Sequence, residues 1–541
     1  MKIALAQLNC HIGNFSFNAD QIVSNIQNAK AAGADLIVFP ELAVCGYPPM
    51  DLLDSEHFIT QCEQTLQSIS KICEGIVAIV GCPSRNPSLK GKNLFNSAFL
   101  LKDGQIQDVF HKTLLPTYDV FDEYRYFEPN SHFRSADIKG LNVAITICED
   151  LWNEEEDPMY RFSPLEKIEN REIDLVINIA ASPFDHDHRE KRIGILKRNA
   201  LKFDAPIIYV NHTGGQNDLI FDGGSLFMDA NGSILHESPY FCENLSVVDI
   251  RNEASMPSTA PLTKPERTKA ALVLGIRDYF NKCGFTDAVL GLSGGVDSAL
   301  VAVLAKEALG PNHVHPVLMP SAYSSQHSID DAVELCKMNG LEPRVISIKD
   351  IYDGYLSSLH AFFEGKPFDI TEENIQSRIR GTILMALSNK HRYVLLNTSN
   401  KSELAVGYGT LYGDMAGGLS VIGDLYKTEV YELCGHINHS CPSIPENILT
   451  KEPSAELRPG QKDSDSLPPY ELLDQILFMH IEGMSSLDQI NHAGFDQGIA
   501  KKILGLVNRS EYKRFQFAPI LRVSTKAFGT GRRFPLVAAY Q

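Results

Sequence analysis

Long apolar runs and closely spaced cysteine pairs are both missing from this 541-residue sequence. No apolar run reaches the roughly 18 residues that a membrane-spanning helix needs. The N-terminal apolar stretch is short and is broken by Gln7 and Asn9, which is too little for a signal peptide. The eleven cysteines include no CxxC pair, which predicts reduced thiols rather than disulfides or a zinc site. We therefore expect a cytoplasmic protein without membrane contact.

Basic residues are also too few for a protein that binds polyanions. Lys and Arg total 49 against 67 Asp and Glu, which gives a formal net charge of −18. Binding phosphates along a nucleic acid needs clustered Lys and Arg, so we expect no nucleic-acid partner. A local pocket for one nucleotide stays open. The length of the chain exceeds that of one hydrophobic core and predicts at least two domains.

The sequence alternates short apolar runs with longer amphipathic stretches, which predicts the α/β class. A proline-containing stretch without apolar periodicity indicates a linker at 251–267, which separates a domain at 1–250 from one at 268–541. A second irregular, proline-rich stretch at 449–469 is either a disordered insert or a substrate lid. The strands expected in the first domain are 2–8, 34–40, 75–81, 96–104, 141–148, 173–180 and 205–211, and the helices include 18–32 and 187–203.

The string GLSGGVDSAL starts at Gly291, between an expected strand and an expected helix. Gly294 and Gly295 allow a ligand to approach the backbone closely, and the helix that follows offers free amides to an anion. The loop lacks the GK[ST] of a Walker motif, so γ-phosphoryl transfer is not required. Asp297 beside bound phosphates would suit Mg²⁺. The loop resembles that of the ATP-pyrophosphatase family, whose members cleave ATP to AMP and pyrophosphate while adenylylating an oxygen.

Five further strings narrow this resemblance to the NAD synthetase family. They include ENIQSRIRG, TSNKSELAVGYGTLYGD, PSAELRPGQKDSDSLPPY and STKAFG, and with the loop they extend over 265–541. The resemblance implies a doubly wound parallel sheet, ATP as co-substrate and Mg²⁺ held by Asp297 and Glu403. Taken singly, Glu403 could only complement a helix dipole, Asn374 and Thr398 could be helix caps, and Lys526 could be a solvated side chain. The positions carried over by motif are Gly291, Leu292, Ser293, Gly294, Gly295, Val296, Asp297, Ser298 and Thr398 for ATP, and Asn374, Glu403 and Lys526 for deamido-NAD.

The first domain carries a different candidate constellation, Glu41, Lys112 and Cys148, each at the end of an apolar run. A thiol is mostly protonated at neutral pH, so Cys148 needs a base such as Glu41 to act as a nucleophile. A nearby ammonium such as Lys112 would stabilise the negative charge that develops when the thiolate attacks an amide. Singly, a cysteine at a strand end is more often a core residue.

The strings FPELAVCGYPP, HKTLLPTYDVFDEYRYFEP and ICEDLW resemble the carbon-nitrogen hydrolase (nitrilase) superfamily, in its glutaminase branch. The resemblance spans about 1–250 and implies an α-β-β-α sandwich. It places Tyr118 and Ser182 at the glutamine substrate. The family often has a basic residue where this chain has His188. The DHDH string at 185–188 resembles a metal site in composition, but without a third ligand a solvated loop is favoured.

Together the two resemblances imply one chain in which the first domain releases ammonia from L-glutamine and the second uses ammonia and ATP to amidate deamido-NAD. They also imply a homo-oligomer with sheltered passage of ammonia. Three alternatives remain at this point: an amidotransferase with another acceptor, an RNA-modifying protein, and a catalytically inactive assembly protein. The formal charge of −18 disfavours the second, and the joint presence of the candidate residues disfavours the third.

Overall fold

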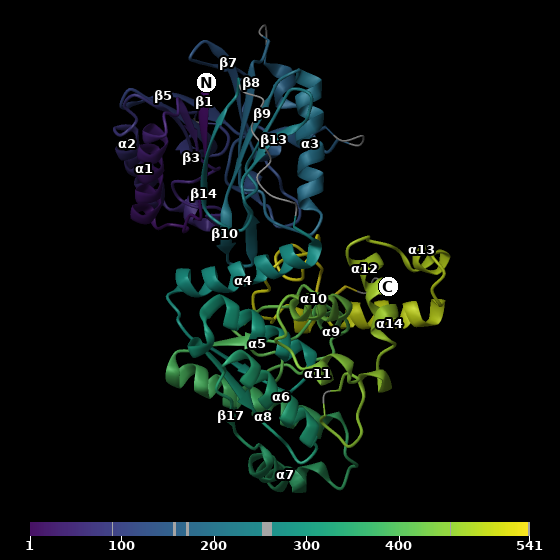
Figure 1. The fold of residues 1–541 in the computed structure, drawn as a ribbon. Helices are drawn as coiled ribbons and strands as arrows, with labels where there is room; N and C mark the ends of the chain where they lie inside the picture. The colour runs from purple at the N-terminus through teal and green to yellow at the C-terminus, as the bar shows by residue number, and fades with distance from the viewer. Residues whose placement is uncertain (89, 155–157, 169–171, 252–261, 455, 539–541) are drawn as a thin grey trace. The chain divides into compact units, whose positions relative to one another are not determined.

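The computed structural model describes residues 1–88, 90–154, 158–168, 172–251, 262–454 and 456–538. The chain forms two compact units, Met1–Leu262 and Thr263–Gln541. Each unit is described by itself. Figure 1 shows the course of the chain through both.

Unit 1 contains two six-stranded sheets, with strand orders β14-β1-β2-β3-β4-β5 and β13-β12-β9-β8-β7-β6. Helices α1 and α2 pack on the first sheet and α3 packs against the second, which gives four layers (Figure 1). The helices are α1 (Phe15–Ala31), α2 (Glu56–Ser70) and α3 (His188–Phe203). The strands are β1 (Lys2–Gln7), β2 (Leu36–Val38), β3 (Val77–Arg85), β4 (Leu94–Lys102), β5 (Gln105–His111), β6 (Ala136–Ile138), β7 (Leu141–Ile147), β8 (Leu175–Ala180), β9 (Ile207–Asn211), β10 (Thr213–Gln216), β11 (Leu219–Asp222), β12 (Leu226–Met228), β13 (Ile234–Glu237) and β14 (Asn244–Asp249).

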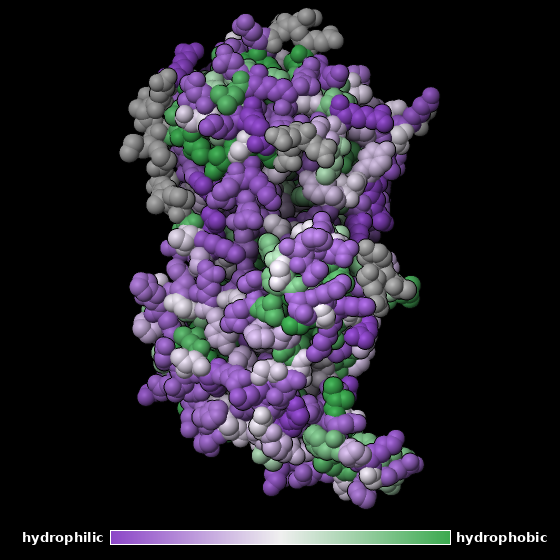
Figure 2. All heavy atoms as spheres, turned by 90° about the vertical axis from the view of Figure 1, so that its right-hand side faces the viewer, coloured by the Kyte–Doolittle hydropathy of each residue, from purple (hydrophilic) through white to green (hydrophobic). Residues whose placement is uncertain are grey.

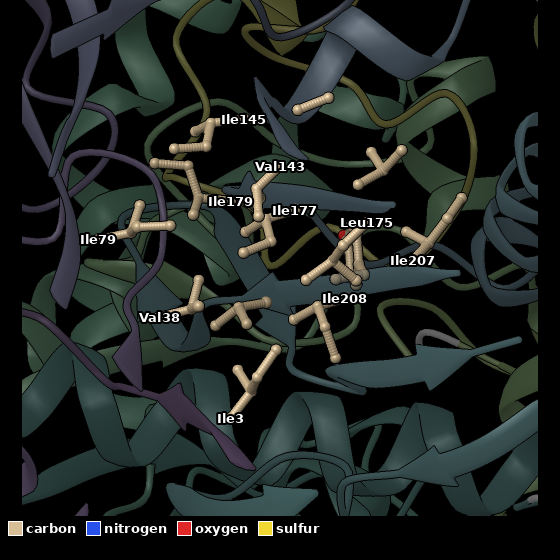
Figure 3. Packing of buried hydrophobic residues seen from close by; sticks show 14 of the residues in the cluster. Ile3, Val38, Ile79, Val143, Ile145, Leu175, Ile177, Ile179, Ile207 and Ile208 are labelled. Carbon is tan, nitrogen blue, oxygen red and sulfur yellow. The ribbon is translucent and has the colours of Figure 1, made fainter. Parts of the chain in front are cut away.

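The alternation of side chains along β1 explains how this sandwich is filled. Ile3 and Leu5 point into the core between the sheets, where they meet β-branched residues such as Ile177 (Figure 3). Ala4 and Ala6, on the opposite face, pack under α1 beside Ile22 and Ile26 in a second core. Because successive strand residues point to opposite faces, strands that are apolar on both faces must be covered on both. The predicted α-β-β-α sandwich is confirmed.

Unit 2 contains a five-stranded parallel sheet of order β17-β16-β15-β18-β19. The strand order reverses between β15 and β18, so loops that leave the carboxyl ends of these two strands border the crevice where ligands bind in doubly wound folds. The strands are β15 (Ala288–Gly291), β16 (Val314–Leu318), β17 (Arg344–Val345), β18 (Val394–Asn397) and β19 (Leu419–Ser420). The helices are α4 (Lys264–Cys283), α5 (Val296–Leu309), α6 (Gln326–Asn339), α7 (Lys349–Phe363), α8 (Ile370–His391), α9 (Lys401–Val406), α10 (Lys427–Ser440), α11 (Glu446–Thr450), α12 (Tyr470–Ile481), α13 (Leu487–His492), α14 (Gln497–Arg509) and α15 (Glu511–Arg514).

Two hydrophobic cores support this sheet and its surroundings. On one face, Ile375 and Ile379 of α8 pack against Val289 and Val317. A separate core joins α9 to the C-terminal helices α12 and α14 and includes Leu404. The short helix α9 is therefore fixed by helices far from it in the sequence.

Two expectations need correction. Helix α4 begins at Lys264, so residues 264–267, assigned to the linker, are helical; Thr263 and Glu266 form the capping box that starts it. Residues 252–261 of the expected linker lie outside the described part. Residues 449–454 and 456–469 are described and make specific hydrogen bonds, so the disordered-insert alternative is wrong for them; residue 455 lies outside the described part.

The surface and the cysteines agree with the sequence analysis. Figure 2 shows a mostly hydrophilic face with scattered hydrophobic residues on both units. In the part of the chain that the structure covers, no helix combines the length and hydropathy that crossing a bilayer requires. Each of the eleven cysteines is a free thiol.

Candidate active sites

Cys148 stands on a tight turn directly after β7. Its φ of 43° is in the left-handed region, which a non-glycine residue adopts only when its surroundings hold it there. The carboxylate of Asp150 supplies that support, because it accepts the N–H of Ile147 at 3.0 Å. Its other oxygen accepts the N–H groups of Thr113 and Leu114, both at 2.9 Å. Asp150 therefore ties the turn of the nucleophile to the segment that follows Lys112.

Lys112 and two carboxylates form a fully buried cluster beside this turn. The Nζ of Lys112 lies 2.7 Å from Oε1 of Glu41 and 2.8 Å from Oε1 of Glu123. Asn96 donates to Glu41 at 2.6 Å, and Tyr47 donates to Glu123 at 2.9 Å. The structure thus brings Glu41 and Lys112 together and adds Glu123. Sequence reasoning missed Glu123 because it follows no strand; only its burial separates it from the other acids nearby.

The charges in this cluster define the protonation states. Burial lowers the pKa of Lys112, but the charges of Glu123 and Glu41 outweigh that effect and raise the pKa well above its ordinary value. Burial, followed by the charge of Glu41, raises the pKa of the Cys148 thiol well above its usual range. The resting site therefore holds an ammonium and a protonated thiol. A base must remove the thiol proton before the sulfur can attack.

Glu149, next to the nucleophile, carries a second buried carboxylate that the sequence analysis did not select. Tyr118 donates to its two oxygens at 2.9 and 3.1 Å, and Tyr160 donates to Oε1 at 3.1 Å. Burial raises the pKa of Glu149 to about 7, although the Lys112 charge and the two tyrosine hydroxyls oppose the rise. The predicted residue Tyr118 is therefore hydrogen-bonded to Glu149, the neighbour of Cys148 in the chain.

Ser182 lies after β8, on a segment that touches Glu41 directly. Ala181 donates its N–H to Oε2 of Glu41 at 2.9 Å, which helps to hold the carboxylate of Glu41 in place. The N–H of Ser182 itself is bonded to Asn211 Oδ1 at 2.9 Å, so the segment is fixed at both residues. The backbone N–H of Ser182 is therefore already bonded, and its hydroxyl makes a separate contact.

That side chain meets His188 at the start of α3. Ser182 Oγ and His188 Nε2 are 2.6 Å apart, and the imidazole stacks on Trp152 with ring centres 5.0 Å apart. Nδ1 of His188 lies 3.5 Å from Asp185. Asp185 and His186 are buried, so the interpretation of 185–188 as a solvated loop is wrong for these two residues, whereas Asp187 is exposed and His188 is partly buried. Among the described residues, no group of three metal-ligating side chains is placed to hold a metal.

The glycine loop of unit 2 turns at Gly294, whose φ is 79°. A Cβ at this position would lie 2.2 Å from the carbonyl oxygen of Ser328, so the position requires glycine. Ser293 and Ser298 close the loop: their hydroxyls are 3.1 Å apart, and Ser293 Oγ also accepts the N–H of Gly295 at 3.1 Å. Gly295 caps α5 without a side chain, which leaves the amides at the helix start available to an anion.

Asp297 and Glu403 converge on one ammonium. Lys427, at the start of α10, forms an ion pair with Asp297 and lies 3.5 Å from Glu403. Asn400 donates to Asp297 at 2.9 Å and accepts the N–H of Glu403 at 3.0 Å. Burial, followed by the charge of Asp297, raises the pKa of Glu403 to about 8. Lys427 was missed because nothing in its local sequence distinguishes it from a solvated lysine.

With the geometry of both sites described, comparison with known proteins decides the family. Residues 2–255 match the carbon-nitrogen hydrolase family and residues 268–517 match NAD synthase. A glutamine-dependent NAD(+) synthetase from Synechocystis sp. is 47% identical over 99% of both chains, and one from Thermotoga maritima is 39% identical over 100% of this chain and 99% of its own. The chain belongs to the glutamine-dependent NAD(+) synthetase family. The family resemblances drawn from the sequence are confirmed, and members of this family are ligases.

A solved structure extends the match to the whole fold of a glutamine-dependent NAD(+) synthetase. The enzyme from Acinetobacter baumannii, determined with ADP, is 38% identical, covers 100% of this chain and 99% of its own, and has a TM-score of 0.79. The predicted fold class, a nitrilase-like sandwich followed by a parallel-sheet synthetase domain, is confirmed by the sheets and this likeness.

The remaining predicted residues of the synthetase unit lie on three other elements. Thr398 follows β18, which neighbours β15, so it borders the crevice at the point where strand order reverses. Asn374 lies on α8, and its Oδ1 accepts from Thr410 at 2.7 Å. Lys526 is half-buried on the segment after Val523. Their roles toward ligands remain predictions.

The stretch 449–469 makes specific contacts within unit 2. Glu456 accepts hydrogen bonds from the hydroxyls of Ser325 and Ser328, at 2.7 and 2.8 Å, at the start of α6. Asp463 accepts from Tyr408 at 3.2 Å and Tyr470 at 2.9 Å. Because Ser328 also contacts Gly294, this stretch lies next to the glycine loop.

Proposed function

We propose that unit 1 hydrolyses the side-chain amide of L-glutamine at Cys148 and that unit 2 uses the ammonia to amidate deamido-NAD at the expense of ATP. The observation that carries the first half is the burial of Lys112 between Glu41 and Glu123 beside a cysteine on a strained turn. A cluster of this kind is costly to bury and suits acid–base chemistry better than fold stability.

The hydrolysis would proceed in two steps. Glu41 takes the proton of Cys148, and the thiolate attacks the amide carbon while Lys112 stabilises the charge that grows on the amide oxygen. The C–N bond breaks, the proton on Glu41 passes to the leaving nitrogen, and ammonia departs from a thioester. Water, deprotonated by Glu41, then attacks the thioester and releases glutamate, which restores the thiol.

Recognition of glutamine would rest on polar groups around the same turn. The carboxylate of Glu149 matches the α-ammonium of the substrate, and Tyr118 holds that carboxylate through its hydroxyl. Ser182 and His188 offer a hydroxyl and an imidazole to the α-carboxylate. We expect His188→Ala to raise KM for glutamine about tenfold without changing KM for ammonia, as loss of one charge-assisted contact implies.

In unit 2, the loop Gly291–Ser298 would hold the phosphates of ATP and Thr398 would contact the nucleotide. Asp297 and Glu403 fit Mg²⁺, which favours one or two carboxylates together with phosphate oxygens. Burial, followed by the charge of Asp297, raises the pKa of Glu403 to about 8, and Lys427 only partly offsets these effects, so the two carboxylates would accept a further positive charge. A bound Mg²⁺ would supply that charge and neutralise the phosphates.

The rest of the reaction follows from the chemistry of an inert carboxylate. The nicotinate carboxylate of deamido-NAD attacks the α-phosphorus of ATP, pyrophosphate leaves, and ammonia displaces AMP from the adenylyl ester to form the amide. Asn374 and Lys526 would orient deamido-NAD. Water competes for the adenylyl ester, so the site must close, and the segment 449–469 beside the glycine loop is the proposed lid. A cytoplasmic homo-oligomer remains a prediction from the resemblance.

The acceptor is tested with purified protein, ATP, Mg²⁺ and ammonium, with AMP and pyrophosphate measured for each of several carboxylated nucleotides. Deamido-NAD should give one AMP and one pyrophosphate for each NAD formed. Release of AMP and pyrophosphate with a different acceptor, but not with deamido-NAD, would contradict the assignment.

A further inference from the structure

A second buried charge cluster in unit 2 centres on Lys401, a residue of α9 that the reaction outlined above does not use. Its side chain is fully buried. The Nζ lies 2.9 Å from Oδ1 of Asp424 and also forms an ion pair with Glu482. It donates to Ser524 Oγ at 2.7 Å and to the backbone carbonyl of Lys526 at 2.9 Å. One ammonium thus joins α9 to the segment that carries Lys526.

Asp424 binds the same segment. Its Oδ2 accepts the N–H groups of Val523 and Ser524 at 2.8 and 2.7 Å, and its Oδ1 accepts the Ser524 hydroxyl at 2.7 Å. Arg522 adds donations to the carbonyls of Ser524 and Thr525, both at 3.1 Å. The backbone from 523 to 526 is therefore fixed by side chains rather than by a helix or a strand.

The elements joined by this cluster are those that carry the candidate synthetase residues. Lys401 stands two residues before Glu403 on α9, and Asp424 stands three residues before Lys427. Burying a lysine with two carboxylates costs desolvation energy that an apolar core would avoid. A fully hydrogen-bonded polar cluster does, however, impose one geometry on its partners.

We propose that Lys401 is a positioning residue, which together with Asp424 and Ser524 holds Lys526 in place at the deamido-NAD site. This inference rests on the proposed function of Lys526. In this proposal, Lys401 contacts no reacting atom of the substrate. The ammonium acts on the backbone carbonyl of Lys526, which is a half-buried residue.

The test compares Lys401→Met with the unaltered protein in ammonia-supported synthesis. Met keeps an unbranched side chain, one atom shorter than Lys, and removes the donors, so we expect KM for deamido-NAD to rise roughly five- to twentyfold, while KM for ATP and the hydrolysis of glutamine change less than about twofold. Asp424→Asn should raise the same KM. Thermal unfolding of each variant defines a temperature at which all are folded.

Lys513→Met is the matched control. Lys513 donates to the carbonyls of Gly407 and Gly409, both at 2.7 Å, beyond the other end of α9. Its loss should lower the unfolding temperature and leave KM for deamido-NAD unchanged. An equal rise in KM in this variant would overturn the inference, because any weakening of α9 would then suffice.

A double-mutant cycle with Lys526→Ala separates the positioning role of Lys401 from the proposed contact of Lys526 with deamido-NAD. We expect Lys526→Ala alone to raise KM for deamido-NAD, and Lys401→Met to add less than about twofold in that background. If Lys526→Ala raises KM and Lys401→Met adds its full effect in that background, the positioning role of Lys401 is overturned and the substrate contact of Lys526 stands. No effect of Lys526→Ala overturns both that role and the proposed contact of Lys526 with substrate.

Discussion

The ionisation of Glu149 should control how well unit 1 uses glutamine near neutral pH. Only the carboxylate can pair with the α-ammonium of the substrate, and burial sets the pKa of Glu149 to about 7. The raised pKa means that the neutral acid prevails below pH 7 and the carboxylate above it. At pH 6 about a tenth of the free enzyme is ionised at this residue, and at pH 8 about nine-tenths. The competent fraction therefore rises about tenfold over this range.

The substitution Glu149→Gln keeps the shape of the neutral acid and cannot ionise. The assay is glutamate release, with kcat/KM for glutamine measured from pH 5.5 to 8.5, because that quantity reports the free enzyme. We expect the ratio of the unaltered enzyme to the variant to increase about tenfold between pH 6 and pH 8. Taking the ratio cancels every other group that titrates in both proteins.

A matched variant tests the direction of the effect. Tyr160 donates to Glu149 and so favours its ionised form. Tyr160→Phe removes that hydrogen bond and should move the midpoint of the pH profile upward. A ratio that stays constant with pH, or a midpoint that moves downward in Tyr160→Phe, would refute this account of Glu149.

Three more substitutions probe the supports of the two sites. Asp150→Asn replaces an acceptor of three backbone N–H groups by an amide with one acceptor oxygen, and we expect at least a tenfold loss of glutamate release with ammonia-supported synthesis intact. Gly294→Ala places a methyl group 2.2 Å from Ser328 O at a φ of 79°, and we expect KM for ATP to rise about tenfold or more in pyrophosphate release. Glu403→Gln should remove synthesis with either nitrogen source and leave glutamate release unchanged; full synthesis at saturating Mg²⁺ would exclude Glu403 from the site.

The fold could be read from the sequence wherever burial on both faces produced continuous apolar runs. The strands β1, β2, β3, β7, β8 and β9 all lie within the expected ranges or start in them. The short strands β10 and β12 were missed, since three or four residues carry too little pattern. Helix α2 was missed although Ser55 caps it, because the polar stretch around it resembles a loop.

For the sites, sequence position was informative where a residue follows a strand, as for Glu41 and Cys148. It failed where burial and distant partners create the chemistry. Glu123, Glu149 and Lys427 have no local pattern that distinguishes them from solvated charged residues, and only the folded chain shows that each is buried against a candidate residue. The role of Lys401 likewise depends on partners more than 20 residues away in the chain.

Whether the two reactions occupy separate sites is decided by NAD formation in Cys148→Ala, with glutamine in one assay and ammonium chloride in the other, each with deamido-NAD, ATP and Mg²⁺. Two separate sites predict that glutamine-supported synthesis is abolished while ammonia-supported synthesis proceeds at the rate of the unaltered enzyme. Equal loss of both activities, or glutamine-supported synthesis that survives the substitution, would contradict the assignment of Cys148 as the nucleophile that supplies ammonia.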